Sequence, residues 1–146
     1  MTAEALVLDA SVTAAWLLPD EHTPAARQAY ARLRSGVVEA HAPELWLWEC
    51  GNIVANAVKR GRASVDDGLL LWSVLDAVRT RVELATFEPN QVRACLVLAL
   101  EHRLSIYDAA YLWLALSLKL PLLSADKTLI QAALQRGLTV IKLEDL

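Results

Sequence analysis

The sequence predicts an α/β fold, a single domain with a mostly parallel central sheet of about four to five strands flanked by helices. Short apolar segments of strand-like pattern alternate with segments of helical spacing along the whole chain. Capping residues, prolines and glycines separate these segments at the places where helices would begin and end. Such alternation is typical of parallel strands covered by helices on both faces. With 146 residues, the chain fits one domain spanning residues 1–146.

Local signals set the expected elements of the first half. Ser and Thr hydroxyls accept hydrogen bonds from the first N–H groups of a helix, Pro suits its first turn, and Gly accepts the left-handed conformation after its last. In order, we expect a strand over 5–8, a helix capped by Ser11 and stopped by Pro19, a helix opened by Thr23 and Pro24 and ending near Gly36, a strand over 38–42, a helix opened by Pro43 and ending near Gly61, and a helix over 65–78 with Ser64 and Asp67 as a capping box.

The second half continues the alternation. Val82, Leu84 and Thr86 alternate with their neighbours as residues of a strand do. In order, we expect a strand over 82–87, a helix over 90–101, a helix ending near Leu118 with Ser105 and Asp108 as a capping box, a strand over 122–124, a helix over 126–135 closed by Gly137, and a final strand over 139–142.

Four acidic residues lie at positions where a lone carboxylate is costly. Asp9, Glu49, Asp108 and Asp126 occur in the apolar stretches LVLDASV, PELWLWECGN, LSIYDAAYLWLA and LLSADKTL. Burial penalises the charged form of an acid unless it has a partner. Asp9 and Asp126 follow strands and Asp108 opens a helix, so these three can face one crevice at the carboxyl ends of the strands. An oxygen-rich pocket of this kind suits a hard divalent cation.

Each acid also has a structural interpretation. Asp108 would belong to a capping box, and Asp126 would be the N-cap of the next helix. Glu49 would be a surface residue of its helix. Asp9 is the hardest to explain in this way, because Ser11 is available as the cap of the helix that follows it.

Composition restricts the class of protein. The 55% hydrophobic content is high for a soluble monomer, so we expect a homodimer or a complex. The longest apolar run, over 109–118, is shorter than the ~20 residues that cross a membrane, and no secretion signal is visible, so we expect a cytoplasmic protein. A net charge of −3 exerts no general attraction on nucleic acid.

The cysteines and histidines do not predict a nitrogen or sulfur metal site. Cys50 and Cys95 are isolated in the sequence, which favours two buried core residues in a reducing compartment. The three histidines lack ligand spacing with one another and with the cysteines. The tryptophans are interpreted as core or interface residues, namely Trp16, Trp46, Trp48, Trp72 and Trp113.

The motifs LDASVTAAWLL, PELWLWECGNIVANAVKRGR, LSIYDAAYLWLA and LSADKTL occur in this order along the chain. In this respect the chain resembles the PIN domain family of metal-dependent ribonucleases, and in particular the VapC-type toxins of toxin–antitoxin pairs. The resemblance implies that Asp9, Glu49, Asp108 and Asp126 are catalytic residues that hold Mg²⁺ or Mn²⁺. It assigns Ser11 to orienting the site, with the helix cap as the alternative. Asn52 would support the site one turn beyond Glu49, with a buried structural amide as the alternative.

The resemblance implies an endoribonuclease that cleaves RNA with metal-activated water and that is inhibited by an antitoxin peptide. Three other functions stay open: a PIN-fold RNA-processing nuclease outside a toxin–antitoxin pair, a phosphotransferase with an aspartyl nucleophile, and a non-catalytic module that binds basic peptides in the acidic pocket. The phosphotransferase pattern requires a second Asp where Ser11 stands. A basic patch of Lys59, Arg60 and Arg62 is interpreted as a solvated face, with RNA contact as the alternative.

Overall fold

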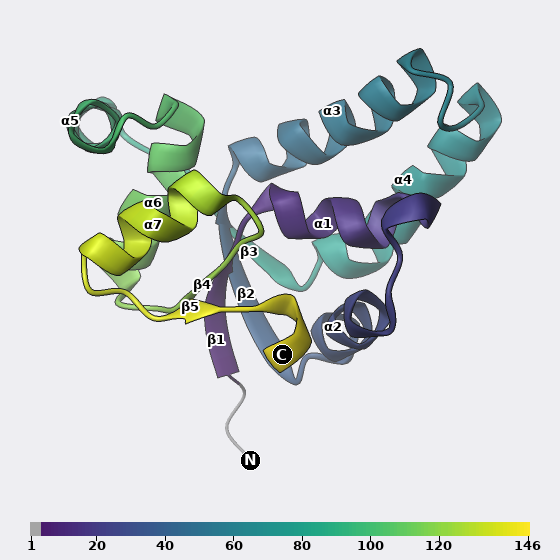
Figure 1. The fold of residues 1–146 in the computed structure, drawn as a ribbon, viewed down its shortest axis with the longest axis horizontal. Helices are drawn as coiled ribbons and strands as arrows, with labels where there is room; N and C mark the ends of the chain where they lie inside the picture. Colours follow the sequence, from purple (N-terminus) through teal and green to yellow (C-terminus); the bar gives the residue numbers. More distant parts are fainter. Residues whose placement is uncertain (1–3) are drawn as a thin grey trace.

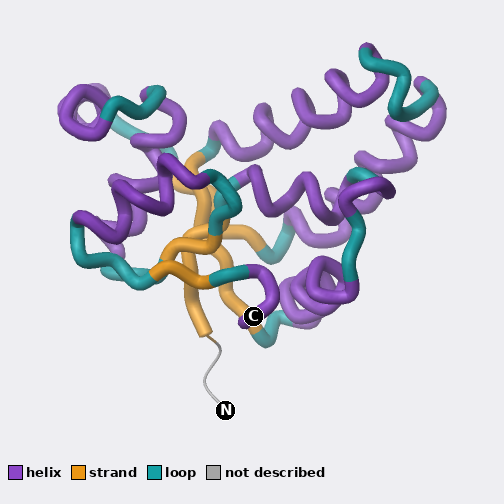
Figure 2. Tube along the Cα trace, in the orientation of Figure 1, coloured by secondary structure: helices purple, strands orange, loops and turns teal. Residues whose placement is uncertain are grey.

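The structure is a computed structural model, and it describes residues 4–146. Within this range, five parallel strands form one sheet in the order β3-β2-β1-β4-β5. Helices α1 to α4 lie on one side of the sheet and α5 to α7 on the other (Figure 1). The strands form the centre of the molecule and the helices surround them (Figure 2). The predicted α/β class with a parallel sheet is confirmed.

The elements have the following bounds. The strands are β1 (Glu4–Leu8), β2 (Val38–Pro43), β3 (Val82–Ala85), β4 (Leu122–Leu123) and β5 (Val140–Ile141). The α-helices are α1 (Ala10–Leu17), α2 (Pro24–Ser35), α3 (Leu45–Lys59), α4 (Val65–Arg79), α5 (Pro89–His102), α6 (Ile106–Leu118) and α7 (Lys127–Gln135). Two short 3₁₀ helices that the sequence did not indicate cover Pro19–Glu21 and Leu143–Asp145.

Most helix ends follow the local signals. The hydroxyls of Thr23, Ser64 and Ser105 each accept a hydrogen bond from the backbone N–H three residues on. Gly36 follows α2 in the left-handed conformation with φ of 80°. The last strands are shorter than expected, because β4 and β5 each contain two residues.

Two expected helix starts are wrong. Ser11 does not cap α1, since the helix begins at Ala10 with Asp9 in the N-cap position and Ser11 lies inside the first turn. Pro43 does not open α3 but ends β2, whose register pairs it with Ala85 of β3. A proline is compatible with the last position of a strand. Helix α3 therefore begins two residues later, at Leu45.

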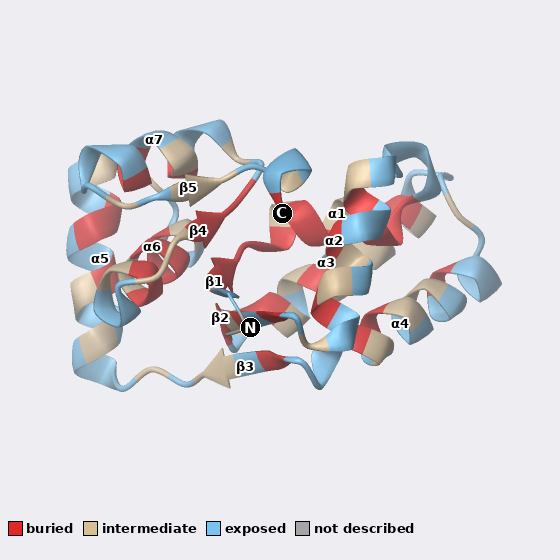
Figure 3. Cartoon of the chain, turned by 90° about the horizontal axis from the view of Figure 1, so that it is seen from below, coloured by how far each residue is buried: buried red, intermediate tan, exposed pale blue. Residues whose placement is uncertain are grey.

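The central strand β1 forms the middle of the core. Leu6, Val7 and Leu8 are fully buried, as expected for a strand covered by helices on both faces. In Figure 3 the buried segments run through β1, β4 and the facing sides of α1 and α6. Cys50 and Cys95 are both buried, as predicted. Among the residues that the structure describes, no helix is long and apolar enough to cross a membrane.

The register between β1 and β4 determines where polar residues meet. Val7 pairs with Leu122 and Leu8 with Leu123, and the backbone N–H of Asp9 donates to the carbonyl of Leu123 at 3.0 Å. Both strands end at this point. The residues that follow them, Asp9 and Ser124, therefore lie next to each other at the carboxyl edge of the sheet.

Candidate active site

Asp9 is a buried carboxylate held by two hydroxyl groups. Its side chain is 3% exposed at the end of β1. Its Oδ2 accepts hydrogen bonds from Ser11 at 2.6 Å and from Ser124 at 2.7 Å. The Ser11 hydroxyl also accepts a bond from the backbone N–H of Ala125 at 2.9 Å. Ser11 therefore connects the end of β1 to the loop after β4 and contacts the Asp9 carboxylate, whereas it does not cap α1.

Asp126 reaches the same edge from β4. Its backbone N–H donates to the Ser124 hydroxyl at 3.0 Å, so one serine contacts both acidic residues. Asp126 is also the N-cap of α7, and its Oδ1 accepts a bond from the backbone N–H of Leu129 at 2.9 Å. The cap and the site position are thus compatible in one residue, because a carboxylate has two oxygen atoms.

Glu49 projects from α3 and is half-buried rather than a surface residue. Its Oε1 accepts a short hydrogen bond of 2.6 Å from the hydroxyl of Tyr111. Tyr111 belongs to α6, is fully buried, and lies three residues after Asp108. This bond connects the helices that carry Glu49 and Asp108 across the sheet.

Asp108 lies in the first turn of α6 and is half-buried. Ser105 caps the backbone of this turn, so the Asp108 carboxylate is not needed as the cap. Burial raises the pKa of Asp108, and the charges of Asp126 and Asp9 raise it further. The carboxylate therefore lies within electrostatic range of two of the other acids.

The pKa values of Asp9 and Glu49 are raised by burial and by the charges of the same group of acids. Burial raises the pKa of Asp9, the Ser11 and Ser124 hydroxyls counteract this, and the charge of Asp126 adds to the increase. Burial also raises the pKa of Glu49, opposed by the Tyr111 hydroxyl and reinforced by the charges of Asp9 and Asp108. Mutual repulsion among carboxylates is the arrangement that a bound cation would relieve.

The donor atoms of the site suit a hard divalent cation, but the side chains are not arranged as a complete set of metal ligands. In the part of the chain from residue 4 onward, no three Asp, Glu, His or Cys side chains are arranged to hold a metal ion together. The charges of neighbouring acids nevertheless help to raise the pKa of Asp9, Glu49 and Asp108, and all the donor atoms of these side chains are oxygens. Oxygen donors suit Mg²⁺ or Mn²⁺.

For Asn52, support of the site stays a prediction, whereas its burial can be checked. This residue is exposed one turn beyond Glu49, so the expected buried amide is wrong. Asn52 instead lines an apolar hollow of about 580 Å³ between α3 and α4, together with Leu47, Trp48, Gly51, Ala55 and Trp72. None of the four acids lines this hollow. Helical periodicity placed Asn52 near Glu49 correctly, but it could not indicate which side of the helix another element would cover.

Sequence reasoning missed two residues of the site. Ser124 was assigned only to a strand, and Tyr111 was read as part of an apolar helix. The signal for Ser124 was a hydroxyl at the end of a buried strand beside Asp126. Tyr111 offered a weaker one, a phenol in a helix interior that needs a hydrogen-bond partner when buried.

The comparisons with known proteins support the same reading of the fold. A model of the family described as "PIN domain" matches residues 6–135. The chain belongs to the PIN domain family. This PIN domain is 30% identical over 128 residues to Ribonuclease VapC3 of Pyrobaculum aerophilum, covering 85% of this chain and 91% of the relative. The resemblance to the PIN family and its VapC-type members is therefore confirmed.

Two solved structures share the fold of this PIN domain. The crystal structure of PAE2754 from Pyrobaculum aerophilum superposes with a TM-score of 0.71 at 23% identity, covering 99% of this chain and 92% of that one. The crystal structure of FitAcB from Neisseria gonorrhoeae superposes with a TM-score of 0.65 at 16% identity, covering 97% and 99%. At these identities the similarity concerns the fold.

Proposed function

We propose that this PIN domain is an endoribonuclease dependent on Mg²⁺ or Mn²⁺, with Asp9, Glu49, Asp108 and Asp126 as its metal-binding and catalytic residues. The observation that carries the proposal is the group of acids at the carboxyl edge of a PIN-family sheet, whose charges help to raise the pKa of Asp9, Glu49 and Asp108. Such an edge is where ligands bind in open α/β folds. The 30% identical relative named as a ribonuclease supports RNA as the substrate.

In this mechanism, neighbouring side chains orient the acidic residues. The hydroxyls of Ser11 and Ser124 hold Asp9, and the Tyr111 hydroxyl holds Glu49, so both carboxylates are oriented before substrate binds. A divalent ion, when bound, supplies acidified water and relief of the charge that develops on the phosphate. Burial of Asp9 keeps bulk water away from the innermost carboxylate and strengthens its electrostatic interactions.

The test is cleavage of single-stranded RNA by purified protein with Mg²⁺, Mn²⁺ or a chelator. Cleavage is expected only with metal and is lost in Asp9→Asn, which keeps the size of the side chain but removes its charge. Asp66→Asn, an exposed acid in the first turn of α4, is the matched control and retains activity. Cleavage in the chelator, or equal activity of Asp9→Asn, would show that these acids are not the catalytic group.

We further propose that the protein is the toxin of a toxin–antitoxin pair and acts in the cytoplasm. The hollow between α3 and α4 offers an apolar surface for an antitoxin peptide, with Trp48 80% exposed beside it. Trp48 is adjacent to Glu49 in sequence, so a peptide held there could extend a basic side chain to the acids. An arginine or lysine would reduce their mutual repulsion in the absence of metal.

The test of this partner requires the antitoxin, which would be encoded by a reading frame next to that of this protein. Trp48→Ala is expected to weaken antitoxin binding, while Leu134→Ala, an exposed leucine on α7, leaves binding unchanged. Replacing every Arg and Lys of the antitoxin segment with Ala should relieve inhibition of the nuclease. Full inhibition by that altered segment would refute the electrostatic part of the proposal.

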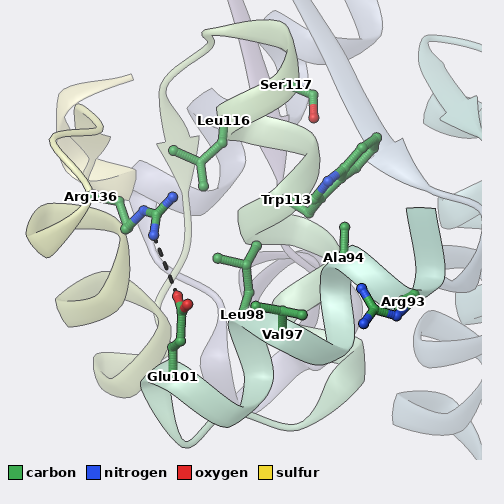
Figure 4. A pocket seen from close by; sticks show the side chains of 9 residues that line it. All are labelled: Arg93, Ala94, Val97, Leu98, Glu101, Trp113, Leu116, Ser117 and Arg136. Carbon is green, nitrogen blue, oxygen red and sulfur yellow. Dashed lines mark ion pairs between the residues drawn. The ribbon is translucent and has the colours of Figure 1, made fainter. Parts of the chain in front are cut away.

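A homodimer is proposed through α5. Val92, Leu96 and Leu100 are exposed at intervals of four residues and form one apolar stripe along this helix. Beside the stripe, Val97, Leu98, Trp113 and Leu116 line a hollow of about 470 Å³ between α5 and α6 (Figure 4). A side chain of a second copy could fill this hollow. Sedimentation should show a dimer at micromolar concentration and a monomer for Leu96→Glu, whereas Leu134→Glu remains dimeric.

A further inference from the structure

A polar hollow of about 240 Å³ lies between the end of α5 and one face of α7. Its lining consists mainly of side chains that form hydrogen bonds: Glu101, His102, Arg103, Thr128, Gln131 and Gln135. This lining differs from that of the two larger hollows described above, which are mainly apolar. A small apolar ligand would gain little here, so the hollow suits a ligand rich in oxygen atoms.

The hollow leads away from the candidate active site. Thr128, Gln131 and Gln135 follow the spacing of one helical face, and Thr128 lies two residues after Asp126. At a rise of 1.5 Å per residue, Thr128 and Gln135 are separated by about 10 Å along α7. On the opposite wall, Arg103 lies five residues before Asp108. Thr128 and Arg103 are therefore the lining residues nearest in sequence to two of the acids.

The charges around the hollow favour an anion. Arg103 follows α5 in the left-handed conformation with φ of 55° and is exposed, and Lys127 is exposed at the first position of α7. The carboxylate of Glu101 is paired with Arg136 at 3.5 Å, at the border with the apolar hollow (Figure 4). Of the Glu101 carboxylate and the Arg103 guanidinium that line the hollow, the first is therefore paired and the second supplies a positive charge.

His102 adds hydrogen-bonding capacity in the same wall. Its Nε2 is buried, and among residues 4–146 it has no hydrogen-bond partner. A buried polar atom without a partner costs free energy, so a ligand that supplied one directly or through water would be stabilised there.

The basic patch indicated by the sequence is a weaker candidate for the same role. Arg62 binds Asp20 at 2.6 Å and Glu21 at 3.1 Å, so its charge is neutralised within the protein. Lys59 lies ten residues beyond Glu49 on α3, which is about 15 Å along the helix axis. The polar hollow is nearer in sequence to two acids, and its Arg103 has no ion-pair partner among residues 4–146.

We infer that this hollow binds the sugar–phosphate backbone of the RNA strand on one side of the scissile bond. The inference rests on the proposed ribonuclease function. Arg103 contacts a phosphate, while Thr128, Gln131 and Gln135 donate to phosphate oxygens or exchange hydrogen bonds with ribose hydroxyls. Such contacts position the strand without selecting its sequence, because every nucleotide carries the same groups.

The test measures binding of a fluorescent single-stranded RNA to the protein in chelator, where the proposed cleavage does not proceed. Arg103→Gln should weaken binding about tenfold and make the slope of log affinity against log salt shallower by about 0.7, the value for one lost phosphate contact. Gln131→Ala should weaken binding less and leave the slope unchanged, because it removes no charge. Arg34→Gln is the control with the same charge change, at an exposed position on α2.

The outcomes separate this inference from the function on which it rests. If the unaltered protein cleaves RNA with Mn²⁺ but both hollow variants bind RNA like Arg34→Gln, the backbone site is refuted and the nuclease remains. If the unaltered protein does not cleave RNA, both proposals fail. An acidic peptide can also be tested for displacement of the fluorescent RNA. If it displaces this RNA as effectively as unlabelled RNA of equal charge does, the site is a general anion site and the assignment to an RNA strand is overturned.

Discussion

Asp9 combines deep burial with two short hydrogen bonds from serine hydroxyls. Burial favours the protonated acid, whereas the hydroxyls stabilise the carboxylate. The protonation of Asp9 therefore depends on the balance between these two effects. The burial of Asp9 was predictable from LVLDASV alone, because the acid directly follows an apolar strand. Ser124 was not, because the hydrogen bond to Asp9 joins residues 115 positions apart.

Ser124→Ala tests this network. The substitution removes the donor to Asp9 and the acceptor for the backbone N–H of Asp126. We expect the free energy of unfolding to fall by about 1–3 kcal/mol in urea titrations. Ser73→Ala, at an exposed position of α4, should change it by less than about 0.5 kcal/mol. Equal effects of the two variants would mean that the network contributes nothing.

Tyr111→Phe removes a hydroxyl that orients Glu49 and leaves the ring in place. If Glu49 binds metal, loss of this bond should weaken Mn²⁺ binding in calorimetry about 10-fold or more, as for other groups that orient metal ligands. Tyr107→Phe is the control on the same helix, because Tyr107 is 60% exposed. Unchanged Mn²⁺ affinity in Tyr111→Phe would contradict the role of Glu49 as a ligand.

At the scale of elements, most helix ends were predictable and the pairing of strands was not. A cap depends on residues within one turn, so Thr23, Ser64 and Ser105 could be recognised from their neighbours. The order of strands depends on contacts between distant segments, which local patterns do not encode. Pro43 was misread for a related reason, since its place in β2 is defined by pairing with β3.

The contact between α3 and α4 depends on a glycine. A Cβ atom on Gly68 would lie 2.9 Å from Cγ2 of Val58 and 3.3 Å from Cγ1 of Val54, both on α3. We expect Gly68→Ala to lower the free energy of unfolding by about 1–3 kcal/mol through overpacking. The measurement is the shift of the urea midpoint.

Gly51 provides the matched comparison at the same helix pair. A Cβ there would meet Trp72 at 3.6 Å, an ordinary contact. Gly51→Ala should therefore stabilise the protein by about 0.5–1 kcal/mol, because alanine favours the helix. A gain of stability in both variants would show that α3 and α4 separate easily.

At the scale of the whole molecule, the fold brings acids from four separate segments within electrostatic range. An acid whose pKa is raised by folding holds its proton better in the folded state. The free energy of unfolding therefore falls as the pH rises from the unfolded pKa, about 3.9 for Asp, through the higher folded value. For Asp9, Glu49 and Asp108, this contribution is fully present below the unfolded pKa and is lost toward neutral pH.

Asp108→Asn separates this effect from other titrations. Without metal at neutral pH, the variant should unfold a few degrees above the parent, because the repulsion has been removed. The difference should shrink as the pH falls toward 4, where the parent carboxyl becomes neutral. Excess Mn²⁺ should reverse it, since only the parent keeps all the acids. A difference independent of pH would exclude electrostatic repulsion as its cause.

The central place of β1 also affects the protein during its synthesis. The strand that precedes Asp9 is paired on one side by β4, which is made more than a hundred residues later. Ser124 and Asp126 arrive with β4. A nascent chain that has formed only β1, β2 and β3 has an open sheet edge and lacks these two residues. The acidic site is therefore assembled only after β4 has emerged, when most of the scaffold that carries it has already been made.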